Sequence, residues 1–179
     1  MQIWDTLEEN FSVNHKIFDS YILKRKHPKS NIIGDFTVIK SNDWVNLIPV
    51  TKDNKIVMIE QYRHGTNDIT LEVPGGLIEN NENHRIAGQR ECTEETGYFS
   101  DEEAIYLGMS EPNPAFMNNC MYHYLWKNCE LKFEQNLDVF EDIKVVLFTQ
   151  DEIEEMIKEG RINHSLVLSA FYFKTIRNL

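Results

Sequence analysis

The stretch GLIENNENHRIAGQRECTEETGY, residues 76–98, decides the fold and carries the most distinctive chemistry of this 179-residue chain. Toward its end it brings three acids close together, Glu91, Glu94 and Glu95. In a helix, Glu91 and Glu95 lie one turn apart on the same face, and Glu94 lies beside them. Like charges this close repel one another. The arrangement is therefore either a solvated acidic surface or a place where cations bind.

Local signals predict that the middle of this stretch is a helix over residues 84–96. Asn83 is a typical N-cap residue, and Gly97 is suited to the left-handed position after a helix. Gly88 lies in the helix interior, where glycine costs about 1 kcal/mol relative to alanine. This cost suggests that the backbone at Gly88 packs closely against a neighbouring element.

The composition limits the classes of protein to which the chain can belong. Its length is that of one domain, or of one domain with a small appendage. The formal net charge of −11 argues against nucleic acid or an anionic membrane as the main partner. No run reaches transmembrane length, and residues 1–10 lack a signal-peptide pattern. Cys92, Cys120 and Cys129 lack CxxC spacing and are expected to be reduced thiols, so a cytoplasmic protein is predicted.

The hydrophobic pattern predicts mixed strands and helices, and hence an α+β fold. Residues 1–12 are expected to form an irregular arm or a short helix. Helices are expected over residues 84–96, from 149 to about 159, and from 163 onward. Strands are expected at residues 16–26, 35–40, 44–51, 55–63, 69–74, 104–109, 121–126 and 143–148.

The spacing of the acids also resembles a known family. The stretch fits G-x5-E-x7-R-E-U-x-E-E-x-G-U, where U is a bulky apolar residue, which is the signature of the Nudix hydrolases. Cys92 and Tyr98 occupy the apolar positions. A chance match at one starting point has a probability below about 10⁻⁷ at average residue usage. The fixed positions are Gly76, Glu82, Arg90, Glu91, Glu94, Glu95 and Gly97.

The resemblance implies an architecture. It predicts the Nudix fold, in which a mixed β-sheet is sandwiched between helices (α/β/α), here with a small N-terminal antiparallel sheet. We expect residues 1–43 to form an N-terminal arm and this small sheet, and residues 44–179 to form the hydrolase domain. A homodimer is also implied, with the N-terminal strands contributing to the interface.

The resemblance further implies a metal site. The family holds Mg²⁺ or Mn²⁺ with the glutamates of its RExxEE segment and with a main-chain carbonyl beside the first glycine. In this sequence these positions are Gly75, Glu91, Glu94 and Glu95, and two or more ions per site are expected. Arg90 is expected to pair with Glu82 and so to orient the metal ligands.

Segments outside the signature resemble the ADP-ribose pyrophosphatases. The sequence has QYR at residues 61–63, LEVPGG at 71–76, and a proline sixteen residues beyond Tyr98. The resemblance makes Arg63, Glu72 and Pro114 the expected substrate contacts.

A general base is expected in a late loop. Glu141 matches the EDI sequence of relatives there, with Asp142 and Asp138 as alternatives. The expected catalytic residues are therefore Glu141, Glu94 and Arg90. Trp44 and Phe36 are candidates either for stacking on a nucleobase or for core packing. The histidines His64, His84, His123 and His164 show no ligand-like spacing and are expected to be surface or packing residues.

The resemblance predicts a metal-dependent hydrolase of nucleoside diphosphate sugars that converts ADP-ribose to AMP and ribose 5-phosphate. The loop sequence NPAFMNN at residues 113–119 differs from the sequence that is frequent at this place in the ADP-ribose pyrophosphatases. This departure keeps GDP-mannose, other nucleotide sugars and dinucleotides open as substrates. A further alternative is a nucleotide-sensing module without catalysis.

Overall fold

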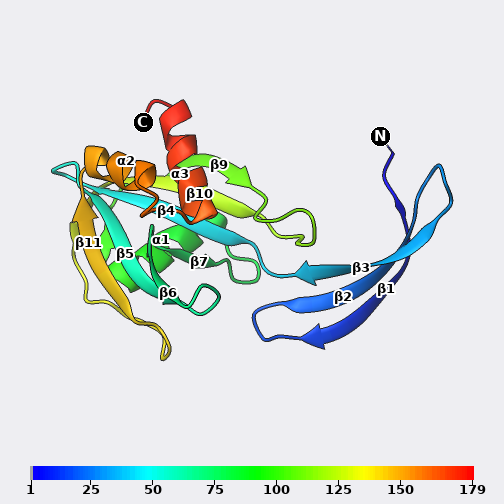
Figure 1. The fold of residues 1–179 in the computed structure, drawn as a ribbon. Helices are drawn as coiled ribbons and strands as arrows, with labels where there is room; N and C mark the ends of the chain where they lie inside the picture. Colours follow the sequence, from blue (N-terminus) through cyan, green and yellow to red (C-terminus); the bar gives the residue numbers. More distant parts are fainter. Residues whose placement is uncertain (1) are drawn as a thin grey trace. The chain divides into compact units, whose positions relative to one another are not determined.

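The computed structural model describes residues 2–179, which form two compact units (Figure 1). The first unit comprises the chain up to Asn42 together with Glu111–Cys120. The second comprises Asp43–Ser110 and Met121–Leu179. The sequence pattern gave no sign that the segment Glu111–Cys120 would join the N-terminal strands.

The first unit is a three-stranded antiparallel sheet in the order β1-β2-β3, which confirms the predicted small sheet. Its strands are β1 (Asp5–Asn14), β2 (Asp19–Lys26) and β3 (Ile33–Lys40). The expectation of an irregular or helical arm over residues 1–12 was wrong, because β1 pairs along its length with β2. All residues of β1 are exposed, and its few apolar residues, Leu7, Phe11 and Val13, are separated by acids and other polar residues, which weakens the strand pattern.

The second unit is an eight-stranded mixed sheet with three helices. Its strands lie in the order β11-β5-β4-β10-β8, with β6 paired to β5, β7 to β4 and β9 to β10. The pairing of β10 with β4 is parallel. Its elements are β4 (Trp44–Thr51), β5 (Ile56–Arg63), β6 (Asp68–Glu72), β7 (Gly75–Leu77), α1 (His84–Thr96), β8 (Tyr98–Phe99), β9 (Ile105–Ser110), β10 (Met121–Leu131), β11 (Ile143–Phe148), α2 (Gln150–Lys158) and α3 (Ser165–Ile176).

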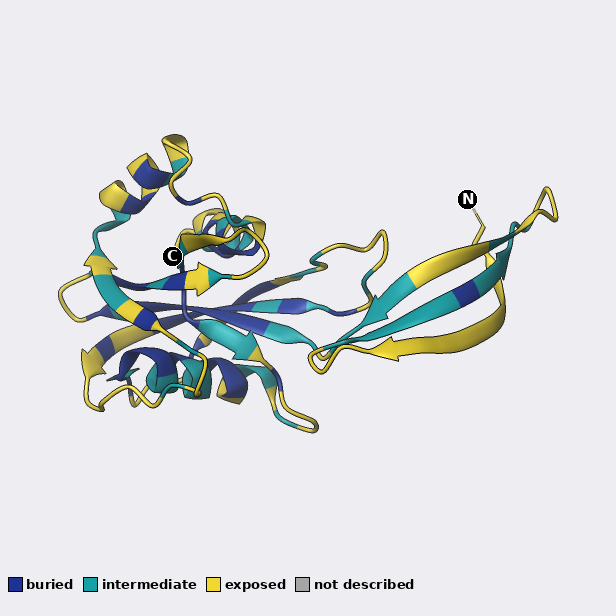
Figure 2. Ribbon diagram, turned by 60° about the horizontal axis from the view of Figure 1, so that its bottom comes forward, coloured by how far each residue is buried: buried dark blue, intermediate teal, exposed yellow. Residues whose placement is uncertain are grey.

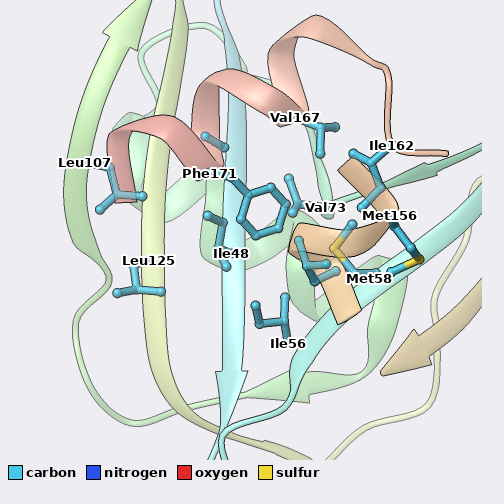
Figure 3. Close-up of a cluster of buried hydrophobic side chains, with 12 residues drawn as sticks. Ile48, Ile56, Met58, Val73, Leu107, Leu125, Met156, Ile162, Val167 and Phe171 are labelled. Carbon is cyan, nitrogen blue, oxygen red and sulfur yellow. The ribbon is translucent and has the colours of Figure 1, made fainter. Parts of the chain in front are cut away.

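The side chains of β4 alternate between two hydrophobic clusters, one on each face of the sheet. Ile48 packs with residues of α2 and α3, as Figure 3 shows for Met156, Val167 and Phe171. Leu47 packs on the other face with residues of α1. Figure 2 shows that the buried positions gather on the central strands and the inner faces of the helices. The predicted α/β/α sandwich is confirmed.

Helix α1 begins and ends where the sequence predicts. The Asn83 side chain accepts a hydrogen bond from the backbone N–H of Arg85, and Gly97 adopts φ 74°. A Cβ on Gly88 would lie 2.9 Å from Cγ2 of Val45. The glycine therefore allows α1 to pack closely on β4, and this fixes how the acids of α1 face the rest of the unit.

None of the helices within residues 2–179 is long and apolar enough to cross a membrane. The three cysteines are free thiols.

Candidate active site

Two glycines of β7 bring the backbone against the acids of α1. The Glu95 carboxylate, whose residue is 3% exposed, accepts a hydrogen bond of 2.9 Å from the backbone N–H of Gly75. A Cβ on Gly76 would lie 2.6 Å from Cδ of Glu91. Only glycine leaves room for that carboxylate at this position. The β7–α1 contact is therefore built around carboxylates.

Arg90 ties several of these carboxylates together. Its Nε donates to Oε1 of Glu82 at 3.0 Å, and its Nη2 donates to Oε2 of the same residue at 3.0 Å. Its Nη1 donates to both Glu91 and Glu94, each at 3.0 Å. Hydrogen bonds to Glu82 and the charge of Glu91 raise the pKa of Arg90, although its partial burial opposes this. Arg90 thus holds Glu91 and Glu94 in place and partly offsets their charge.

Burial and mutual repulsion make the deeper carboxylates costly to ionise. Burial raises the pKa of Glu95 well above its usual value, and the charges of Glu91 and Glu141 raise it further. Burial also raises the pKa of Glu91, and the charges of Glu94 and Glu141 act in the same direction. Carboxylates in this condition gain from a cation placed between them.

The residues present suit a hard divalent cation. Magnesium and manganese prefer oxygen ligands, which Glu91, Glu94, Glu95 and the adjacent Gly75 backbone supply. Within residues 2–179, no group of three Asp, Glu, His or Cys side chains is already arranged to coordinate a metal ion. Arg90 forms ion pairs with three of these acids, Glu82, Glu91 and Glu94. The assignment of the metal ligands stays a prediction.

Glu141 lies in the loop before β11 and faces the acids of α1. Its charge contributes to the raised pKa of both Glu91 and Glu95. Glu141 is half-buried, whereas the two alternatives, Asp138 and Asp142, are exposed. Its carboxylate accepts a hydrogen bond from the backbone N–H of Asp138 at 3.1 Å. Glu141 is therefore partly buried and close enough for its charge to act on Glu91 and Glu95, and its role as the base stays a prediction.

A cavity of about 680 Å³ lies on the other side of the two glycines. Its lining combines apolar side chains, those of Trp44, Val73, Leu77, Met121 and Leu166, with polar ones and three glycines. Its size suits a ligand of several hundred daltons. The lining residues are Trp44, Asn46, Arg63, Gly65, Thr66, Thr70, Glu72, Val73, Gly75, Gly76, Leu77, Met121, Asn163, His164, Ser165 and Leu166.

Arg63 and Glu72 form a bidentate pair in the polar part of this cavity. Nε of Arg63 donates to Oε1 of Glu72 at 2.7 Å, and Nη2 donates to Oε2 at 2.9 Å. Thr70 donates to the same carboxylate at 2.5 Å, and His164 contacts it at 3.0 Å. Burial alone would raise the pKa of Glu72, but the hydrogen bonds from Arg63 and His164 hold it well below its usual value. Glu72 is therefore an ionised carboxylate that fixes the direction of the half-exposed Arg63.

The other predicted contact residues are distributed between the units. Trp44 lines the cavity. Phe36 belongs to the first unit, where its ring meets Trp4 edge-on at 5.5 Å. Pro114 also belongs to the first unit, in the segment Glu111–Cys120. The roles of Pro114 and Phe36 toward a substrate stay predictions.

His164 is the cavity residue whose role the sequence analysis misjudged. His164 was expected to be a surface or packing residue, yet it lines the cavity and contacts Glu72. These residues are far apart in the chain, so no local spacing could have revealed the pair. The other histidines do pack as expected: His84 stacks on Tyr122, and burial lowers the pKa of His123 to about 4.

Comparisons with known proteins agree on one family. The NUDIX domain profile matches residues 42–171. The methanol dehydrogenase activator of Bacillus methanolicus is 33% identical over 137 residues, which cover 76% of this chain and 74% of the activator. The ADP-ribose pyrophosphatase of Bacillus subtilis (strain 168) is 23% identical over 148 residues, covering 82% and 79%. A crystal structure of an ADP compounds hydrolase has the same fold, with a TM-score of 0.86 at 18% identity over 99% of this chain and 94% of that one.

Proposed function

This chain belongs to the NUDIX domain family and is a Nudix hydrolase, and on that premise we propose that it hydrolyses nucleoside diphosphate sugars. The proposed reaction converts ADP-ribose and water to AMP and ribose 5-phosphate. One observation carries the proposal. Gly75 and Gly76 contact the acids of α1 and also line the cavity that contains Arg63. A diphosphate in this cavity would therefore lie between the carboxylates and a guanidinium.

The residues of the cavity suit the two ends of such a substrate. Arg63 directs its positive charge into the cavity because Glu72 holds two of its nitrogens. A guanidinium fixed in this way is well suited to a phosphate oxygen. The aromatic face of Trp44 and its apolar neighbours suit a nucleobase. In this proposal Glu72 acts on the substrate through Arg63, and Pro114 stays an expected substrate contact.

Hydrolysis needs an activated water and a stabilised phosphoryl group. We assign proton removal from the attacking water to Glu141. Glu141 lies close enough to Glu91 and Glu95 for its charge to raise the pKa of both. The water oxygen forms a bond to one phosphorus, the bond from that phosphorus to the bridging oxygen breaks, and the bridging oxygen leaves on the other phosphate.

Glu91, Glu94, Glu95 and the Gly75 carbonyl would hold Mg²⁺ or Mn²⁺, with two or more ions per site. Bound cations would neutralise phosphoryl charge and make water a better nucleophile. Arg90 holds the Glu91 and Glu94 carboxylates beside each other, because its Nη1 donates a hydrogen bond to both. Cations among the carboxylates would also reverse the local charge, which lets a protein of net charge −11 bind an anionic substrate.

A substrate panel tests this proposal. The purified chain is assayed with ADP-ribose, other ADP-sugars, GDP-mannose and dinucleotides, each with magnesium or manganese, and the products are identified. Reaction in oxygen-18 water shows which phosphorus is attacked. We expect AMP and ribose 5-phosphate from ADP-ribose. Faster turnover of GDP-mannose or a dinucleotide would move the assignment to the alternative substrates that the NPAFMNN loop keeps open.

A second candidate function comes from the relative that is 33% identical to this chain, which is named a methanol dehydrogenase activator. We propose that this chain also stimulates an alcohol dehydrogenase. The test measures methanol dehydrogenase turnover with and without the chain, in parallel with the substrate panel. Stimulation that persists in a hydrolysis-deficient Glu94→Gln variant would indicate a binding module rather than an enzymatic activator.

The first unit supports a homodimer. A three-stranded sheet with so little buried side-chain surface is marginal on its own. Leu23 is the one buried hydrophobic residue in its described strands. We propose that a second copy of the chain covers its apolar side chains, whose exposed members include Leu7, Phe11, Val13, Ile33 and Phe36.

A further inference from the structure

His164 occupies an unusual position for a helix N-cap. Residues at this position usually bond the free N–H groups of the first helical turn. The His164 side chain makes no such bond to α3. Its Nδ1 instead contacts Oε2 of Glu72 at 3.0 Å. The orientation of the ring is thus set by the cavity and not by the helix that it precedes.

The chemistry of Glu72 decides which ring nitrogen carries the proton. Its carboxylate accepts hydrogen bonds from Nε and Nη2 of Arg63 and from the Thr70 hydroxyl. An ionised carboxylate can only accept hydrogen bonds, so Nδ1 of His164 must be the donor in their contact. In the neutral imidazole this leaves a bare lone pair on Nε2.

The lone pair on Nε2 is available to a ligand. His164 lines the cavity, and its side chain is 35% exposed. Within residues 2–179, Nε2 has no hydrogen-bond partner. An acceptor cannot bond an ionised phosphate oxygen, which has no proton to donate. It can bond a hydroxyl, and a nucleoside diphosphate sugar carries hydroxyls on both of its sugars.

We propose that His164 is a specificity-determining residue whose Nε2 accepts a hydrogen bond from a hydroxyl of the substrate sugar. The inference rests on the proposed function and adds the part of the substrate that the cavity recognises. Arg63 and His164 share Glu72, so one buried carboxylate aligns a phosphate donor and a hydroxyl acceptor in the same cavity.

Two substitutions separate the nitrogens of this ring. In His164→Asn the side-chain amide can still donate to Glu72, as Nδ1 does, but nothing replaces Nε2. In His164→Gln the longer side chain places an amide near the position of Nε2. The control is His64→Asn, because His64 packs against Tyr62 and does not line the cavity.

The experiment measures kcat/KM for ADP-ribose and two analogues. One analogue lacks a hydroxyl of the adenosine ribose, and the other lacks those of the distal sugar. We expect His164→Asn to lower kcat/KM for ADP-ribose about 3- to 10-fold, the worth of one neutral hydrogen bond. We expect no further loss on the analogue that lacks the recognised hydroxyl, which identifies the sugar. His164→Gln should retain most of the activity, and His64→Asn should be unchanged.

The outcomes distinguish the two proposals. If His164→Asn loses the same factor on ADP-ribose and on both analogues, His164 has only a structural role and the inference fails. If the wild-type chain neither binds nor hydrolyses any nucleotide sugar, the proposed function fails as well.

Discussion

Gly76 and Glu91 are in contact in a way that only glycine permits. A Cβ on Gly76 would fall 2.6 Å from Cδ of Glu91 and 2.7 Å from both of its carboxylate oxygens. These residues come from β7 and α1; Gly76 begins the signature stretch, and Glu91 lies 15 residues later. The spacing between Gly76 and Glu91 in the signature therefore corresponds to a contact between β7 and α1.

Gly76→Ala should displace the Glu91 carboxylate. We expect kcat/KM to fall at least about tenfold, as is typical when a group that orients a metal site is disturbed. The free energy of unfolding should fall by about 1–3 kcal/mol, as for other overpacked positions. The matched control is Gly160→Ala, outside the cavity, where an added Cβ has nothing within 4 Å and only the positive φ of 76° costs stability. Equal effects of the two substitutions on activity would show that the Gly76–Glu91 contact is unimportant.

Glu95→Gln should remove activity and stabilise the metal-free protein. Because burial raises the pKa of Glu95 in the folded state, ionisation opposes folding once the pH exceeds the unfolded-state pKa of about 4.3. This destabilisation grows as the pH rises toward the folded-state pKa, and it disappears below both values. The neutral amide can still accept the hydrogen bond from Gly75. We expect a Tm higher by roughly 2–4 °C at neutral pH without metal, equivalent to about 1 kcal/mol.

Thermal unfolding at several pH values checks this prediction. The gain in Tm of Glu95→Gln over the wild type should shrink as the pH is lowered. Added magnesium should raise the Tm of the wild type more than that of the variant. The control is Glu155→Gln, an exposed acid of α2 whose loss should change neither quantity. A variant that binds magnesium and hydrolyses substrate as the wild type does would exclude Glu95 from the metal site.

Glu141→Gln should separate catalysis from metal binding. If Glu141 removes the proton from water, kcat should fall about 10²- to 10⁴-fold, while the metal-dependent rise in Tm is retained. Asp142→Asn and Asp138→Asn are the controls, since both side chains are exposed. Steady-state kinetics and thermal unfolding of the three variants give the result. A larger loss of kcat in Asp142→Asn or Asp138→Asn would move the base to that residue.

Phe11→Asp should weaken the proposed dimer. Phe11 is 58% exposed on β1, and its ring meets Tyr21 edge-on at 5.7 Å. A charge in an apolar interface is costly to bury, so we expect the dimer dissociation constant to rise at least tenfold. Asn10→Asp adds the same charge on the opposite face of the strand and is the control. Sedimentation velocity over a range of concentrations measures both. A wild-type chain that is monomeric throughout would contradict the proposal.

Much of the second unit follows from local sequence. Residues 44–51, 84–96 and 143–148 were predicted as the elements that the structure contains there. Strands such as β4 show apolar side chains that are buried on both faces, and α1 has clear capping residues. The first strand was missed because β1 is held by its pairing with β2 and buries none of its own side chains. A strand of this kind, with three apolar residues among acidic and polar ones, has only a weak periodic pattern.

By itself the sequence determined the family, because the spacing of Gly76, Glu82, Arg90 and the three acids of α1 is a local pattern that a helix converts directly into geometry. The tertiary structure decided what surrounds those acids. It joined Arg63, Glu72 and His164 across β5, β6 and the start of α3, and it brought Glu141 near the cluster. Such contacts depend on how strands pair and helices pack over long sequence separations. The sequence could name Arg63, Glu72 and Glu141 only one at a time, and only the fold showed that Arg63 and His164 share the Glu72 carboxylate.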